Sequence, residues 1–249
     1  KQIWQWIWRK GCEDFSRMSD LNKQIRIRLQ ERFRLDHPEL QEVRRSEDGT
    51  IKFLLRVGGD DLIETVLIQE GDHYTQCLSS QVGCPLACTF CSTGRMGFNR
   101  NLSSGEILGQ VLAARDYLAR SEDPMPLRNL VFMGMGEPLL NWPQVRKALQ
   151  VIRDEQGLGF SYRRTTLSTV GVPVPLRRFA HSGQGSLAVS LHAPNQELRA
   201  RLMPKAASLV SLPQLIRILE EIPLRPRQRI TLEYALIAGV NDDLKHAGQ

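Results

Sequence analysis

Four of the five cysteines fall between residues 77 and 91, and three of them have the spacing of a ligand set. Cys84, Cys88 and Cys91 form the pattern C-x3-C-x2-C. Gly83 and Pro85 flank the first of these cysteines and favour a tight loop. A secreted disulfide scaffold would spread an even number of cysteines along the chain. We therefore interpret the three cysteines as thiolate ligands that converge on one metal centre.

Three interpretations of this loop remain open. A structural zinc site needs four ligands, and Cys77 or His73 would have to complete it. An iron–sulfur cluster is held by cysteine thiolates, and three thiolates would leave one iron of a four-iron cluster open to a substrate. The third interpretation is three unrelated cysteines in one loop. The spacing favours the cluster.

Two further motifs carry polar groups that could hold a ligand. Gly134 and Gly136 would let the backbone approach a ligand closely, and Glu137 offers an acceptor for an ammonium group. Ser168 and the run Ser190-Leu191-His192 offer groups for ribose hydroxyls or a carboxylate. A tight turn at the glycines and a structural role for the histidine are the alternatives.

A repeated strand–loop–helix order from about residue 74 predicts how these residues are positioned. The alternation predicts parallel β/α units and an α/β fold. In α/β barrels the chemistry gathers at the carboxyl ends of the strands, where the cysteine loop, the glycine turn, Ser168 and His192 all fall. The predicted strands are 75–79, 129–133, 164–168, 186–191 and 230–237, and the predicted helices are 103–120, 143–155, 173–181 and 211–221.

The residues before this repeat predict a helical unit and then a short β extension. Apolar spacing predicts a helix over 2–10, and Ser19 is the expected cap of a second helix. The second helix would carry an apolar stripe of Leu21, Ile25, Leu29 and Phe33 and end before Pro38. Strands are expected over 50–57 and 62–68. The predicted domains are 1–42 (helical, with a role in RNA contact), 43–72 (β extension) and 73–249 (barrel).

The composition narrows the class of protein. The 249 residues are 41% hydrophobic and 24% charged, as in an ordinary globular protein. No apolar run approaches the ~20 residues of a membrane span, and no signal peptide is visible. The net charge is +6, and residues 1–56 contribute +4 of it. This charge permits a nucleic-acid partner. The arginines that we select as candidate phosphate contacts are Arg26, Arg28, Arg32, Arg44 and Arg45, with a merely solvated face as the alternative.

Several motifs together resemble the RlmN/Cfr family of radical S-adenosylmethionine (SAM) RNA methyltransferases. The resemblance covers nearly the whole chain and is greatest to the RlmN branch, which methylates C2 of adenine in 23S ribosomal RNA and in transfer RNA. It implies a partial (β/α)6 TIM-like barrel preceded by the helical domain and the β extension. The motifs are Cys77–Cys84, Cys88–Thr93, Gly97–Leu102, Gly134–Asn141, Thr166–Thr169, Ser190–Asn195 and Gly239–Asp242.

The resemblance also implies cofactors and residue roles. The cofactors are a [4Fe-4S] cluster and SAM. Glu64 would transfer a proton, and Cys77 would resolve a covalent protein–RNA intermediate by thiol exchange, with which the family's disulfide bond is associated. Without the resemblance, a surface glutamate and a buried cysteine would be the simpler interpretations. The implied cluster ligands are Cys84, Cys88 and Cys91, and the implied SAM-binding residues are Gly136, Glu137, Ser168, Ser190, Leu191 and His192.

The chain departs from the family pattern at one point. The family's methyl-carrying cysteine lies near its C-terminus, but no cysteine follows Cys91 here. We therefore expect a chain truncated at both ends, whose missing C-terminal part would close the barrel, and which by itself does not complete methyl transfer. A cytoplasmic monomer served by a reductase such as flavodoxin is expected. The alternatives are the C8-directed Cfr branch, a non-enzymatic metal-binding RNA module, and a degenerate relative that retains RNA binding.

Overall fold

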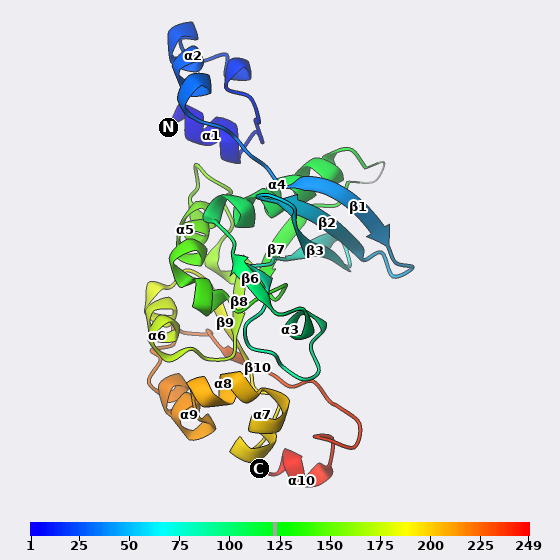
Figure 1. Ribbon diagram of the computed structural model, residues 1–249. Coiled ribbons are helices and arrows are strands. Elements are labelled where there is room, and N and C mark those ends of the chain that lie inside the picture. Colours follow the sequence, from blue (N-terminus) through cyan, green and yellow to red (C-terminus); the bar gives the residue numbers. More distant parts are fainter. Residues whose placement is uncertain (122–123) are drawn as a thin grey trace.

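The computed structural model describes residues 1–121 and 124–249 and consists of one long sheet with helices along it (Figure 1). The sheet order is β1-β2-β3-β4-β7-β8-β9-β10. Strands β1 to β4 pair antiparallel, and each pair from β4 to β10 is parallel. The strands are β1 (Glu39–Arg45), β2 (Ile51–Val57), β3 (Asp61–Glu70), β4 (His73–Cys77), β7 (Leu127–Phe132), β8 (Thr165–Thr169), β9 (Ser186–Ser190) and β10 (Ile230–Glu233).

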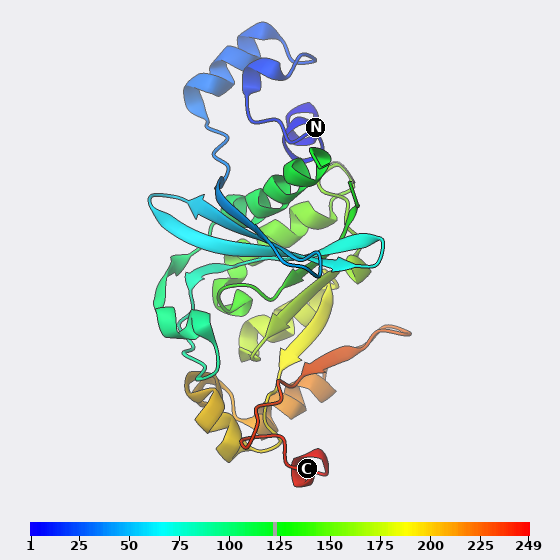
Figure 2. The same ribbon diagram turned by 90° about the vertical axis from the view of Figure 1, so that its right-hand side faces the viewer.

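Helices join the parallel strands and cover one side of the curved sheet, so this part is an open, partial barrel (Figures 1 and 2). Helix α4 begins with a capping box, in which the Ser103 hydroxyl accepts from the Glu106 N–H and the Glu106 carboxylate accepts from the Ser103 N–H. The helices of the barrel are α4 (Ser104–Ala119), α5 (Trp142–Arg153), α6 (Pro173–Ser182), α7 (Gln196–Leu202), α8 (Pro204–Leu209) and α9 (Leu212–Glu220), and α10 (Leu244–Ala247) follows β10.

The β extension and the barrel share one hydrophobic core. Strand β2 buries every second residue, which is the period of a strand with one face against a core. The ring of Phe53 on β2 meets the ring of Tyr117 on α4 edge to face, with centroids 5.0 Å apart. The extension is therefore a continuation of the barrel sheet and not a separate layer.

The N-terminal residues form a small helical unit at one end of the molecule (Figure 1). It contains α1 (Gln2–Trp8) and α2 (Lys23–Arg32) around a core of Cys12, Phe15, Met18 and Leu21. Two expectations for α2 were wrong. Asn22, and not Ser19, caps it, because the Asn22 side chain accepts from the Gln24 N–H at 2.8 Å. The predicted apolar stripe is not buried throughout, since Ile25 is 47% and Phe33 59% exposed.

The predicted order of strands and helices from residue 74 is confirmed, with ends shifted by up to four residues. The most shifted end is that of β10, which stops at Glu233 although the apolar pattern continues to Ile237. The sequence analysis did not predict β1, nor the hairpin of β5 (Gln81–Gly83) and β6 (Phe98–Asn101), nor α3 (Ser92–Met96), α7 and α8. These are short elements around loops. Among the described residues, no helix has the length and apolar character needed to cross a membrane.

Candidate functional site

The cysteine loop is held in a tight turn between β5 and α3. The Cys84 N–H donates to the Gly97 carbonyl at 2.7 Å, and the Cys91 N–H donates to the Cys88 carbonyl at 3.1 Å. Gly83 has a φ of +73°, and a Cβ there would lie 1.9 Å from the Gly97 oxygen. Only glycine fits this position, so the turn that brings the loop back on itself depends on it.

The three thiols line one cavity of about 270 Å³ at the carboxyl ends of the strands. Burial raises the pKa of Cys84, and it raises the pKa of Cys88 to about 11, with the neighbouring thiols Cys84 and Cys91 adding to the effect. Cys84 and Cys88 are therefore neutral thiols near pH 7 until positive charge is bound beside them. The same cavity is lined by Gly134, Gly136, Glu137, Ser168, Ser190, His192 and Glu233.

The geometry speaks against the zinc interpretation. His73 begins β4 and its Nδ1 lies 3.0 Å from the Asp72 carboxylate, whereas Cys77 ends the same strand. Within residues 1–121 and 124–249, no three cysteine, histidine or acidic side chains are arranged to hold a single metal ion. Neither His73 nor Cys77, the two candidates for a fourth zinc ligand, lines the cavity that the three thiols share.

The glycine turn approaches the cysteine side of the sheet closely. Gly136 has a φ of +97°, and a Cβ there would lie 2.5 Å from the Gln81 Cβ. The Glu137 N–H donates to Gln81 Oε1 at 2.8 Å. These contacts fix the turn against β5, at the base of the cysteine loop.

Glu137 is buried, and its carboxylate accepts three hydrogen bonds from the protein. It accepts from the Leu139 N–H at 2.9 Å, the Thr169 hydroxyl at 2.6 Å and the Val170 N–H at 2.9 Å. Burial raises the pKa of this carboxyl, and the three donors oppose the shift. The sequence suggested an acceptor for an ammonium group, but in the structure the carboxylate ties the glycine turn to the end of β8.

The hydroxyls of Ser168 and Ser190 meet at the ends of neighbouring strands. Both donate to Glu233 Oε2, at 2.6 Å and 3.2 Å respectively. Glu233 ends β10 and lines the same cavity. The sequence analysis missed Glu233 because the fifth predicted strand runs to residue 237, which places Glu233 in its middle, whereas β10 ends at Glu233.

His192 is held in an unusual backbone conformation, with a φ of +55°. Its Nδ1 accepts from the Ala235 N–H at 3.0 Å, which leaves the proton of the neutral ring on Nε2. Burial lowers the pKa of His192, although the charge of Glu233 opposes this. The imidazole is therefore neutral near pH 7.

Asn241 joins the loops after β9 and β10 and is 1% exposed. Its side-chain amide donates to the carbonyls of His192 and Ala235, both at 2.8 Å, and its Oδ1 accepts from the Ile237 N–H at 2.6 Å. The sequence analysis quoted Asn241 within a motif but gave it no role. An asparagine that satisfies three backbone groups is what fixes the strained His192.

Three of the residues selected from the sequence do not line this cavity. The Glu64 carboxylate pairs with Lys52 Nζ at 2.8 Å, and the backbone of Glu64 contacts Ser79 and Met135 of the surrounding loops. Cys77 lies at the end of β4, and burial raises its pKa to about 11. Leu191 lines a separate apolar cavity beside α9.

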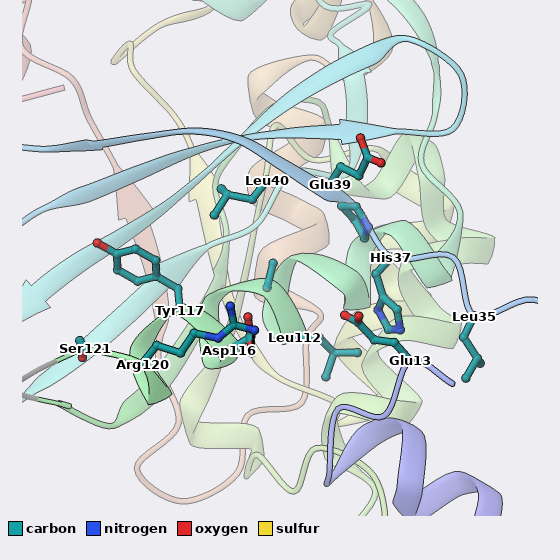
Figure 3. Close-up of a pocket in the computed structure, with 12 residues that line it drawn as sticks. Glu13, Leu35, His37, Glu39, Leu40, Leu112, Asp116, Tyr117, Arg120 and Ser121 are labelled. Carbon is teal, nitrogen blue, oxygen red and sulfur yellow. Dashed lines mark hydrogen bonds and ion pairs between the residues drawn. The ribbon is translucent and has the colours of Figure 1, made fainter. Parts of the chain in front are cut away.

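A larger cavity of about 620 Å³ lies far from the cysteines, where the linker after α2 meets α4 (Figure 3). Its lining includes His37 of the linker, Glu39 at the start of β1, Asp116 of α4 and Arg120 directly after α4 (Figure 3). Arg120 is already paired with Asp116 at 2.9 Å. The smaller cavity, and not this larger one, contains the three thiols and is therefore the candidate site.

Comparison with known proteins agrees with this geometry. Residues 78–247 match the Radical SAM superfamily, and residues 1–35 match the ribosomal RNA large subunit methyltransferase N-terminal domain. The chain is 54% identical to the dual-specificity RNA methyltransferase RlmN of Nitratidesulfovibrio vulgaris (strain DP4), over 99% of this chain and 69% of that protein. It is 43% identical to the RlmN of Marinobacter nauticus, over 99% of this chain and 68% of that protein.

A solved structure has the same fold. The radical SAM methyltransferase from Sphaerobacter thermophilus superimposes with a TM-score of 0.87 at 40% identity, covering 99% of this chain and 72% of that one. Proteins of this superfamily use a [4Fe-4S] cluster and SAM. The three free thiols around the cavity fit the cluster's usual donors. The chain therefore belongs to the Radical SAM superfamily and, within it, to the RlmN family of RNA methyltransferases.

Proposed function

We propose that this protein methylates C2 of adenine in 23S ribosomal RNA and in transfer RNA. One observation carries the proposal: the three thiols, the glycine turn and the Ser168, Ser190 and His192 side chains line a single cavity. The relatives' name, dual-specificity RNA methyltransferase, supports two RNA substrates. C2 of adenine is an electrophilic carbon, so ordinary displacement from SAM does not methylate it, and a radical route is needed.

We assign the residues around the cavity to cofactor binding. Cys84, Cys88 and Cys91 hold the [4Fe-4S] cluster, which when bound supplies one electron to the sulfonium of SAM. The glycine turn at Gly136 and Glu137 presents its backbone to SAM, since the Glu137 carboxylate is engaged elsewhere. Ser168, Ser190 and His192 contact SAM from the neighbouring strand ends, and Leu191 contacts it through its backbone.

Glu64 and Cys77 are assigned to the RNA side of the reaction. Val66 of β3 is opposite Cys77 of β4, and Glu64 lies two residues from Val66, so the Glu64 and Cys77 side chains leave the same face of the sheet. Glu64 accepts the C2 proton as the general base. Cys77 releases the product as a thiolate that attacks the sulfur of the carbon–sulfur link between protein and RNA: an S–S bond forms, the C–S bond breaks, and its electron pair stays on the product, which takes up a proton.

The RNA must reach the cavity with its adenine out of the stack, because C2 is covered in a paired helix. Of the candidate arginines, Arg26 donates to the Ser16 carbonyl at 2.6 Å and Arg44 pairs with Glu42 at 2.6 Å. Arg28, Arg32 and Arg45 form no ion pair among the described residues and are the better phosphate contacts.

We propose domains at 1–42, 43–72 and 73–249, and a cytoplasmic monomer reduced by a flavodoxin-type partner.

The cofactor assignment is tested on the chain itself. After anaerobic reconstitution with iron and sulfide, low-temperature EPR of the reduced protein should give a four-iron signal that changes on addition of SAM. The C88A variant should retain less iron and lose the change with SAM. A colourless protein that binds zinc in place of iron would contradict the radical mechanism.

The methylated position is tested with the full-length protein on unmodified ribosomal and transfer RNA. Nucleoside mass spectrometry should find 2-methyladenosine in both RNAs. Finding 8-methyladenosine instead would assign the protein to the C8-directed branch of the family.

A further inference from the structure

Arg199 of α7 is a fully buried cation without a buried anion beside it. Its exposed fraction is 0%, and it is the largest of the fully buried side chains. Nη1 donates to the Val210 carbonyl at 3.0 Å and Nη2 donates to the Val170 carbonyl at 2.8 Å. Nε has no hydrogen-bond partner, and no carboxylate in the described part of the chain pairs with the guanidinium. Burying such a charge unpaired is costly.

The helix that carries Arg199 is attached to the cysteine loop. The Thr89 N–H, directly after Cys88, donates to the Leu202 carbonyl at the end of α7 at 2.9 Å. Cys84 and Cys88 pack against the apolar cluster that contains Leu198 and Leu202. In both views α7 lies beside the loop that surrounds α3 (Figures 1 and 2).

A second connection runs through Val170. Its carbonyl accepts from Arg199, and its N–H donates to the Glu137 carboxylate at 2.9 Å. Burial lowers the pKa of Arg199, and the charge of a Cys88 thiolate opposes that shift. The hydrogen bonds of the guanidinium thus go to neutral carbonyls, and one of these belongs to the residue that also holds Glu137.

Arg199 lacks a negative counter-charge, and the group that the cysteines hold is negative. A four-iron cluster on three thiolates is an anion, and one-electron reduction makes it more negative. The net charge around such a cluster, hydrogen bonds to its sulfurs and its burial set its reduction potential. We propose that Arg199 is a positioning residue that supplies the buried positive charge to the cluster loop and raises the reduction potential of the cluster. This inference rests on the proposed cluster site.

Arg199 also clamps two carbonyls, so a purely structural role must be separated from an electrostatic one. R199K keeps the charge and loses part of the clamp. R199M and R199Q remove the charge, and R199Q can still donate to one carbonyl, so it serves if R199M does not fold. The matched control is R115M, because Arg115 of α4 is partly buried and, like Arg199, donates to a carbonyl, that of Leu158, at 3.1 Å, away from the cysteine loop.

The measurement is the midpoint potential of the reconstituted chain, from an EPR-monitored titration with dithionite, together with iron content and thermal unfolding. At a fixed potential we expect the reduced-to-oxidised ratio to fall at least tenfold in R199M or R199Q, which is about 59 mV for one electron. R199K and R115M should stay within threefold of the unmodified chain. An unchanged potential in charge-neutral variants that bind a full cluster would overturn this inference alone. An unmodified chain that binds no cluster would overturn the proposed function and this inference with it.

Discussion

Burial sets the chemistry of the thiol at Cys77. It raises the pKa of that thiol to about 11, and the negative charge of Glu233 adds to the effect. Because the thiolate is the reactive form, only a small fraction of Cys77 reacts near pH 7. We expect its alkylation rate by iodoacetamide to rise about tenfold for each pH unit from 7 to 10, measured by peptide-resolved mass spectrometry.

Two comparisons make this expectation specific. Glutathione under the same conditions is the unburied reference, and its rate should level off above its ordinary thiol pKa of about 8.5 to 9. The E233Q variant removes the negative charge that adds to the raised pKa of Cys77 and should speed its alkylation at pH 8. A Cys77 rate that levels off below pH 9 would contradict a pKa raised by burial.

At the level of loops and strands, the glycine turn after β7 requires glycine for two separate reasons. Gly136 has a positive φ, and a Cβ would also collide with Gln81. Gly159 has a φ of +74°, but a Cβ added there would meet no atom within 4 Å, so this position isolates the conformational cost. We expect G159A to lower the free energy of unfolding by about 1 kcal/mol. G136A should lower it by more and weaken SAM binding, as measured by urea unfolding and equilibrium dialysis.

The cross-link made by Asn241 gives a second expectation for the loops. N241A would leave the carbonyls of His192 and Ala235 and the Ile237 N–H without their partner. Each unsatisfied buried group costs about 1–3 kcal/mol. We therefore expect N241A to lower the free energy of unfolding, measured with urea, by roughly 3 kcal/mol and to weaken SAM binding. N195A, which removes the helix cap at α7 and an exposed hydrogen bond to Gln249, is the control and should cost about 1 kcal/mol. Equal SAM affinity in N241A and N195A would contradict a role for Asn241 in holding His192.

How much the sequence predicts depends on whether the signal is local. The alternation of strands and helices and the Cys84–Cys91 spacing are local patterns, and the parallel sheet and the shared cavity agree with them. The cap at Asn22 was missed because Ser19 is an equally good capping residue by type. Glu233 acts through partners at least 43 residues away in sequence, Asn241 reaches His192 across 49 residues, and Arg199 reaches carbonyls 11 and 29 residues away. No periodicity or short motif encodes such pairings.

The N-terminal helical unit and the barrel are joined by few polar contacts. Gln5 and Arg9 of this unit reach Gln156 and Glu155 after α5, and Trp4 and Trp8 pack against the main core. The unit carries much of the positive charge of residues 1–56. If it guides RNA, its contribution is electrostatic and therefore depends on salt.

The contribution of the helical unit to RNA binding can be measured from the slope of log K against log salt concentration, because each phosphate contact releases counterions when RNA binds. Removing one contact to single-stranded RNA lowers the slope of log K against log salt by about 0.7. Arg28 and Arg32 are exposed on α2, so R28Q/R32Q should reduce the slope by about 1.4 if both bind phosphates. R177Q is the control, because Arg177 already pairs with Glu221 at 2.9 Å and its loss should leave the slope unchanged. Filter binding to transfer RNA at several salt concentrations measures all three slopes. An unchanged slope in R28Q/R32Q would mean that the RNA approaches the cavity without touching α2, and would leave Arg45 of the β extension as the remaining free candidate.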